Sequence, residues 1–113
     1  MPKPTSYKGL ELFNLSKKLV IACYELTHDL PVDERSNLAR YIRTAALTVH
    51  VNVAQGAFLK SKKRKKFKRA AKNALIIIDA ATEILVELRL SKQEDIEAVI
   101  SLSSSCYQML DNL

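Results

Sequence analysis

Apolar residues recur at three- and four-residue steps in four separate segments of this chain. Such spacing places them on one face of an α-helix, whereas a half-buried strand would alternate apolar and polar residues. The links between the segments are short, so neighbouring helices would run antiparallel. The pattern predicts an all-α, up-down-up-down antiparallel four-helix bundle, one domain over residues 1–113, with helices at about 7–29, 33–56, 61–89 and 91–112.

Residues at the expected helix ends agree with these boundaries. Asp33 is a candidate N-cap of the second helix, Ser61 is one for the third, and Ser91 with Glu94 forms a capping box before the fourth. Gly56 follows the apolar stripe of the second helix, at a position where a glycine commonly ends a helix. The remaining Gly and Pro are too few for the frequent turns of an all-β fold.

The stretch LTVHVNV, residues 47–53, alternates apolar and polar positions, which is a strand signature. We predict a helix there because the stripe that starts at Leu38 continues through it without a change of phase. As a helix, it carries a second apolar face of Leu47, Val51 and Ala54. A helix with two apolar faces needs two packing partners, which predicts a homo-oligomer with Leu47 and Val51 in its interface.

The third helix begins with a strongly basic run, KSKKRKKFKRAAK, residues 60–72, which holds nine Lys or Arg and no acidic residue. The net charge of the chain is +6, and it is segregated, because all twelve Asp and Glu lie outside the span from Arg35 to Ile78. Phe67 is in register with the apolar stripe that continues through Ala71. We therefore predict that the run is the first third of a folded helix.

Cations at a helix N-terminus oppose the helix dipole and repel one another, at a cost of a few tenths to about 1 kcal/mol each when exposed. Stability alone would favour acidic residues here, so the arrangement is typical of a surface that binds an anion. We predict salt-dependent, weakly sequence-specific contacts to nucleic-acid phosphates. The candidate residues are the cations of the run and, as secondary candidates, three preceding arginines: Lys60, Lys62, Lys63, Arg64, Lys65, Lys66, Lys68, Arg69, Lys72, Arg35, Arg40 and Arg43.

Other interpretations of the run stay open at this point. A frayed basic loop could serve solubility or act as a generic electrostatic handle. A nuclear-localisation signal fits the composition, although Phe67 lies in register with a core stripe. A membrane-surface helix would need an apolar face opposite the lysines, whereas here charge surrounds the helix axis.

The residues give no sign of catalysis, a cofactor or a metal site, so we do not expect an enzyme. His28 and His50 are the only imidazoles, and we expect His50 to pack at the surface or in an interface. Cys23 and Cys106 lie on apolar stripes, which favours buried thiols over a bridge. Asn52 is polar on an apolar stripe and predicts a structural hydrogen bond. The chain begins without a long apolar segment, so we expect a cytoplasmic protein.

A set of short motifs covers nearly the whole chain and is most specific in the second helix. The motifs are Tyr7-Lys8-Gly9-Leu10-Glu11-Leu12, Tyr24-Glu25-Leu26-Thr27, Leu30-Pro31-x-x-Glu34-Arg35, Ile42-Arg43-x-Ala45-Ala46 and Asn52-Val53-Ala54-Gln55-Gly56. They resemble the small bacterial four-helix-bundle proteins first noticed as reading frames within intervening sequences of large-subunit ribosomal RNA genes. The chain departs from that pattern at Gln55 and within residues 71–77, where the family usually carries acidic residues.

Four features resemble the accessory variability proteins of diversity-generating retroelements, a branch of the same superfamily. They are Leu30-Pro31-x-x-Glu34-Arg35, the basic start of the third helix, Leu88-Arg89-Leu90-Ser91 and Gln108-Met109-Leu110. This resemblance implies a pentameric barrel of bundles that binds RNA or an RNA/DNA hybrid together with a reverse transcriptase, without being an enzyme. The alternative function is an oligomeric protein-interaction scaffold with an acidic protein partner.

Overall fold

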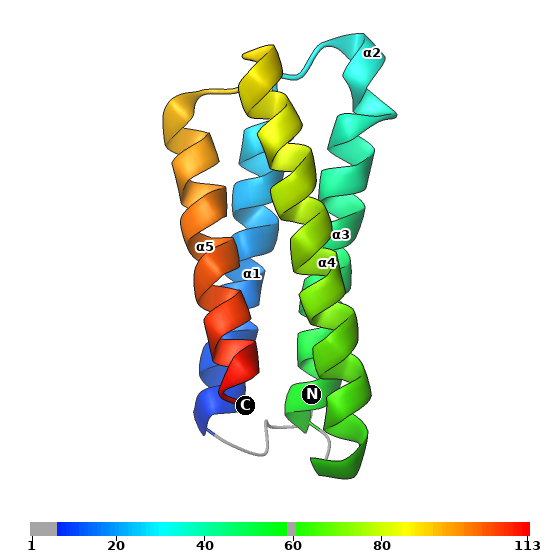
Figure 1. Ribbon diagram of the computed structural model, residues 1–113, viewed down its shortest axis with the longest axis vertical. Helices are drawn as coiled ribbons and strands as arrows, with labels where there is room; N and C mark the ends of the chain where they lie inside the picture. The colour runs from blue at the N-terminus through cyan, green and yellow to red at the C-terminus, as the bar shows by residue number, and fades with distance from the viewer. Residues whose placement is uncertain (1–6, 59–60) are drawn as a thin grey trace.

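Four long helices form an antiparallel bundle, with one short helix at a connection (Figure 1). The computed structural model describes residues 7–58 and 61–113, and the side chains of 7–57 and 64–113. The helices of this described part are α1 (Tyr7–Thr27), α2 (Val32–Arg35), α3 (Leu38–Phe58), α4 (Ser61–Leu88) and α5 (Gln93–Asp111). The predicted all-α bundle is therefore confirmed.

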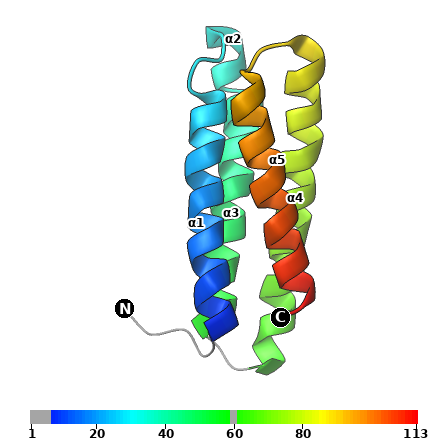
Figure 2. The ribbon, with the colours of Figure 1, turned by 90° about the vertical axis from the view of Figure 1, so that its left-hand side faces the viewer.

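The helices are arranged so that each long helix has two neighbours. α1 packs against α3 and α5, and α4 packs against the same two helices from the opposite corner of the bundle, as the two perpendicular views show (Figures 1 and 2). The bundle measures 42 × 23 × 23 Å. α2 and the α4–α5 connection lie at one end of the long axis, whereas α4 begins and α5 finishes at the other. The start of α4 therefore shares its end of the bundle with the last residues of the chain.

The core consists of the apolar stripes that define the helices in the sequence. The segment 47–53 is helical, and Val49 within it is fully buried, so the strand alternative is wrong. Large side chains from all four long helices meet along the bundle axis, where each stabilises the fold by roughly 1.5–3 kcal/mol. The largest fully buried side chains include Leu12, Leu19, Ile42, Val49, Leu75, Ile78, Leu85, Val99 and Leu110.

The second predicted helix is interrupted near its start. α2 begins at Val32, and Pro31 occupies the N-cap position with φ −54° and ψ 152°. Proline is favoured at a helix start because its φ is fixed and it lacks an N–H to satisfy. The predicted N-cap role of Asp33 is therefore wrong, and its carboxylate lies in the first turn, where it complements the helix dipole. The chain then turns through Ser36 before α3 begins.

The predicted capping box before the last helix is also wrong. α5 begins at Gln93, and its N-cap residue Lys92 makes no side-chain capping bond. Ser91 Oγ instead donates to the backbone oxygen of Leu26, 3.1 Å away at the end of α1. Arg89 has a positive φ of 55°, a left-handed conformation just after the last turn of α4. Ser91 thus ties the α4–α5 connection to α1.

Gly56 lies inside α3, which continues to Phe58, so its predicted role as a helix-ending residue is wrong. It is buried against α4, and a Cβ at this position would lie 3.4 Å from Phe67 Cβ and 3.9 Å from Arg64 Cγ. Arg64 Nε donates to the Gly56 carbonyl at 3.3 Å. The glycine therefore marks the place where α3 and α4 approach closely, beside the basic run.

Replacing Gly56 by Ala distinguishes a glycine that ends a helix from one that lies within a helix at a close contact. Within a helix at negative φ, the added methyl group meets only ordinary van der Waals contacts and removes the entropic cost of glycine. Gly56→Ala should therefore raise the free energy of unfolding by about 0.5–1 kcal/mol in urea denaturation. The bulkier Gly56→Val should lower it by crowding Phe67. If Gly56 instead ended the helix, Gly56→Ala would lower the free energy of unfolding.

Candidate nucleic-acid interface

The basic run forms the first part of α4, which is helical from Ser61 onward. Lys60 lies outside the described residues, and Lys62 and Lys63 lie in α4 with side chains outside the described part. Phe67 is half-buried against α3 at Gly56, as its register predicts. The prediction that the run is helical is confirmed from Ser61, and the frayed-loop interpretation is wrong there.

Three cations of the run are exposed on the outer surface of α4. Lys65, Lys66 and Arg69 surround a shallow depression that Asn73 also lines. Within the described side chains, no carboxylate forms an ion pair with any of the three. Their spacing of three and four residues makes them mutually repulsive. This strip is therefore a cluster of uncompensated positive charge near a helix N-terminus.

Two further cations of the run contact the last turn of α5. Lys72 forms a salt bridge with Asp111 and lies 5.1 Å from the centroid of the Tyr107 ring. Lys68 Nζ lies 3.5 Å from the backbone oxygen of Asp111, at the helix end where cations are favourable. Lys72 and Lys68 thus help to dock α5 on α4. Sequence reasoning missed Asp111 and Tyr107 because only the folded chain brings residues this far apart together.

The three secondary candidate arginines do not join this cluster. Arg35 in α2 and Arg40 in the first turn of α3 lie at the opposite end of the bundle from the start of α4 (Figure 1). Arg43 Nε donates to Thr27 Oγ1 at 2.8 Å, and its guanidinium stacks 4.5 Å from the centroid of the Tyr24 ring. Because the chain reverses direction between α3 and α4, the acid-free span does not form one surface.

The second half of α4 carries charge of the opposite sign. Asp79, Glu83 and Glu87 follow at four-residue steps and are all exposed. Asp79 accepts a 2.8 Å hydrogen bond from Ser103 Oγ of α5. α4 is therefore polarised along its length, with its cations near one end of the bundle and its carboxylates toward the other.

The predicted interface residues lie on α3. Leu47 and Val51 are 43% and 51% exposed, and Ala54 is half-buried. Asn52 is half-buried, and its Nδ2 donates to the Thr48 carbonyl at 2.8 Å. The hydrogen bond of Asn52 thus lies within α3.

His50 packs between α3 and α1. Its Nδ1 shares a 2.8 Å hydrogen bond with the buried Ser16 hydroxyl, and its ring centroid lies 4.8 Å from that of Phe13. Burial, and then the nearby charge of Lys17, lower the pKa of the imidazole. These contacts give His50 a packing role at the α1–α3 contact.

The two thiols are buried in the core, as the apolar stripes predict, and both are free. Burial raises the pKa of Cys23 and of Cys106 to about 12, so each stays protonated and poorly nucleophilic at neutral pH. No group of three or more His, Cys, Asp or Glu in the described residues could hold a metal ion. No helix in the described part of the chain is long and apolar enough to cross a membrane.

These features define a small four-helix bundle in which α4 is basic at its start and acidic farther along. Residues 8–112 match the model of the 23S rRNA-intervening sequence protein family, and the chain belongs to that family. The family relationship suggested by the motifs is thereby confirmed. The family has no known catalytic activity. A comparison with curated proteins found none that matches the chain.

The contact of Asp111 with Lys72 suggests a way to increase the available positive charge. Asp111→Asn removes the carboxylate and releases the Lys72 ammonium, so affinity for a polyanion should rise about two- to fivefold. Elution from a heparin column should shift to higher salt. Asp33→Asn, the same change at the opposite end, is the matched control. Equal shifts for both variants would mean that net charge alone governs binding.

Proposed function

We propose that the protein is a non-enzymatic, RNA-binding accessory protein that contacts phosphates through the exposed start of α4. The observation that carries this proposal is the strip of Lys65, Lys66 and Arg69, which is folded, exposed and free of ion pairs within the described side chains. A phosphate backbone would relieve the mutual repulsion of these cations.

The expected mode of binding follows from the side chains available. Cations that contact phosphates release counterions, so affinity falls steeply with salt and depends little on sequence. Phe67, the one aromatic residue within the run, is half-buried against α3. Base stacking therefore contributes little, and backbone contacts dominate.

The resemblance to accessory variability proteins supports a more specific role. We propose that the nucleic acid is RNA or an RNA/DNA hybrid and that the protein partner is the reverse transcriptase of a diversity-generating retroelement. The features in support are the basic start of α4, the Leu30-Pro31 motif before α2 and the Leu88-Arg89-Leu90-Ser91 segment between α4 and α5. A reverse-transcriptase gene beside the gene for this chain would support that partner.

Assembly into a homo-oligomer, a pentamer by resemblance, would strengthen this function. The exposed Leu47 and Val51 support an interface on α3, because a single bundle leaves about half of each side chain uncovered. Ring closure would repeat the basic end of α4 around a symmetry axis. The summed field would then attract a polyanion more strongly than one chain can.

An oligomeric scaffold for an acidic protein is the second candidate function. The same uncompensated strip of Lys65, Lys66 and Arg69 supports it, since carboxylates would also pair with these cations. Heparin should displace either partner. Only the RNA-binding function predicts a stable ribonucleoprotein from purified components.

Substitution of the strip tests the RNA-binding function. Lys65→Gln, Lys66→Gln and Arg69→Gln together remove three phosphate contacts, so the slope of log K against log salt should become less steep by about 2 to 3 units. The measurement is fluorescence anisotropy with a labelled single-stranded RNA over a salt series. Circular dichroism should show unchanged helicity, because these side chains lie outside the core.

The matched control changes two Lys and one Arg elsewhere. Lys18, Arg89 and Lys92 are exposed on α1 and at the α4–α5 connection. Their replacement by Gln gives the same net charge and should leave the salt slope within about one unit of the parent. If both triple variants weaken binding equally, the strip is not the RNA site.

Charged substitutions on α3 test the homo-oligomer. Leu47→Glu with Val51→Glu should reduce the particle to a monomer, because burying two carboxylates in an apolar interface costs several kcal/mol. Sedimentation at micromolar concentration measures the mass. Val32→Glu, at a side chain 72% exposed on α2, should leave the mass unchanged. A parent protein that is already monomeric would contradict the proposal.

A further inference from the structure

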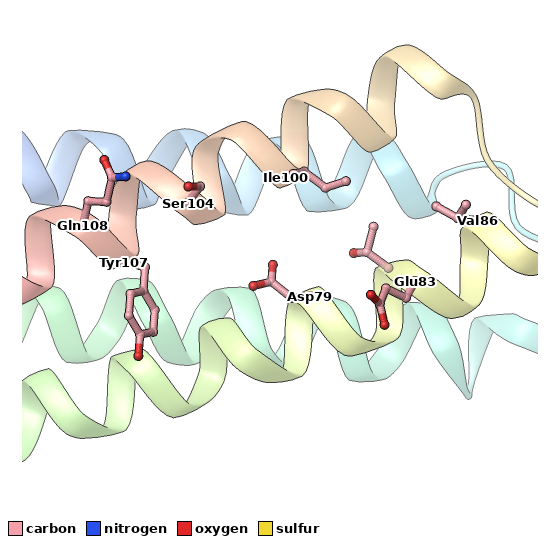
Figure 3. A pocket seen from close by; sticks show the side chains of 8 residues that line it. Asp79, Glu83, Val86, Ile100, Ser104, Tyr107 and Gln108 are labelled. Carbon is pink, nitrogen blue, oxygen red and sulfur yellow. The ribbon is translucent and has the colours of Figure 1, made fainter.

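A groove between α4 and α5 lies outside the basic strip, in the acidic half of α4 (Figure 3). α4 and α5 pack less tightly than the other neighbouring long helices. The space between them has a volume of about 560 Å³, a size typical of small-molecule sites. Asp79 and Glu83 project from α4 beside it, and Ile100 and Tyr107 border it from α5.

A buried hydroxyl on the α4 wall of this groove lacks a partner. Thr82 is 1% exposed, and its Oγ1 makes no hydrogen bond with any described residue. Buried polar atoms are nearly always hydrogen-bonded, so an orphaned one beside a cavity indicates a missing partner. The adjacent Asp79 is fixed, because its Oδ1 accepts from Ser103 Oγ at 2.8 Å.

The charges at the groove are uncompensated. Within the described side chains, neither Asp79 nor Glu83 forms an ion pair. The two residues are four apart on one helix, which separates them by about 6 Å along its axis. Val86 and Ile100 leave 42% and 50% of their surfaces exposed beside these carboxylates. Alternating carboxylate and apolar surface suits a cation with a hydrocarbon body.

The ends of the groove limit what can occupy it. Beyond Tyr107 the groove between α4 and α5 becomes basic, with Lys68 and Lys72 among its lining residues. A long cationic helix laid along both halves would meet these like charges. Ca²⁺ takes six to eight oxygen ligands, which the apolar walls at Val86 and Ile100 do not offer. A short organic cation fits both limits.

We propose that this groove binds a linear aliphatic polyamine. Ammonium groups pair with Asp79 and Glu83, and the methylene chain packs on Val86 and Ile100. One N–H of the ligand donates to Thr82 Oγ1 and satisfies the orphaned hydroxyl. The site is separate from the basic strip, so the inference does not rest on RNA binding.

Calorimetric titration with spermidine tests this site on the full chain without RNA. We expect one spermidine per chain in moderate salt. Asp79→Asn with Glu83→Gln should weaken binding about tenfold or more, because charge-assisted hydrogen bonds are lost. The Asn oxygen still accepts from Ser103. Glu25→Gln with Glu94→Gln, exposed on α1 and α5, is the charge-matched control and should bind like the parent.

Two further variants distinguish spermidine binding in the groove from general electrostatic attraction. Thr82→Val preserves shape and removes the orphaned hydroxyl, so it should weaken spermidine binding about threefold or more while leaving the melting temperature equal or higher. Ile100→Lys should abolish binding by placing a tethered ammonium in the groove. Ile100 is half-exposed, so the fold should tolerate the change.

Several results of these titrations would contradict polyamine binding in the groove. Absence of spermidine binding at millimolar concentration would overturn the proposal. So would parent-like affinity in Thr82→Val, or equal weakening by the charge-matched control. If Mg²⁺ displaced spermidine at the same concentration of positive charge, spermidine would be held only by nonspecific attraction to the surface charge. If the protein bound a lysine-rich peptide but not spermidine, the groove would be a peptide site and not a polyamine site.

Discussion

The packing of the α4 stripe against α3 is the interaction on which the rest of the structure depends. The cations at the start of α4 oppose helix formation by a few tenths to about 1 kcal/mol each. Farther along the same helix, Leu75, Ile78 and Leu85 are fully buried, each with roughly 1.5–3 kcal/mol of apolar stabilisation. The close approach at Gly56 and Phe67 extends this packing to the basic end. The core thus offsets the repulsion and keeps the run folded.

The same antiparallel packing decides which charges become neighbours. It sends the arginines of α2 and the start of α3 to one end of the bundle and the start of α4 to the other. It also brings the last turn of α5 onto α4, where Asp111 and Tyr107 hold Lys72. The exposed strip of Lys65, Lys66 and Arg69 therefore remains as the site that our proposed function uses, and the acidic groove is a separate surface of the same helix.

The sequence predicted the four long helices because each carries a stripe of large apolar residues, a signal that depends on burial alone. It predicted the helical state of the run from Phe67 and Ala71 for the same reason. The details that failed depend on tertiary contacts. Ser91 bonds to Leu26 rather than to its own helix, and Gly56 packs on α4 rather than ending α3. Counting charges along the sequence also grouped Arg40 with the run, because such a count does not take account of the change of chain direction between α3 and α4.

Backbone amide chemical-shift mapping with a single-stranded RNA tests the central claim most directly. If the folded start of α4 is the binding surface, the largest shift changes should fall in residues 61–73 and in the last turn of α5, which contacts Lys72 and Lys68. They should diminish together as salt is raised. Shift changes centred on α2 and the start of α3, or none within α4, would contradict this account.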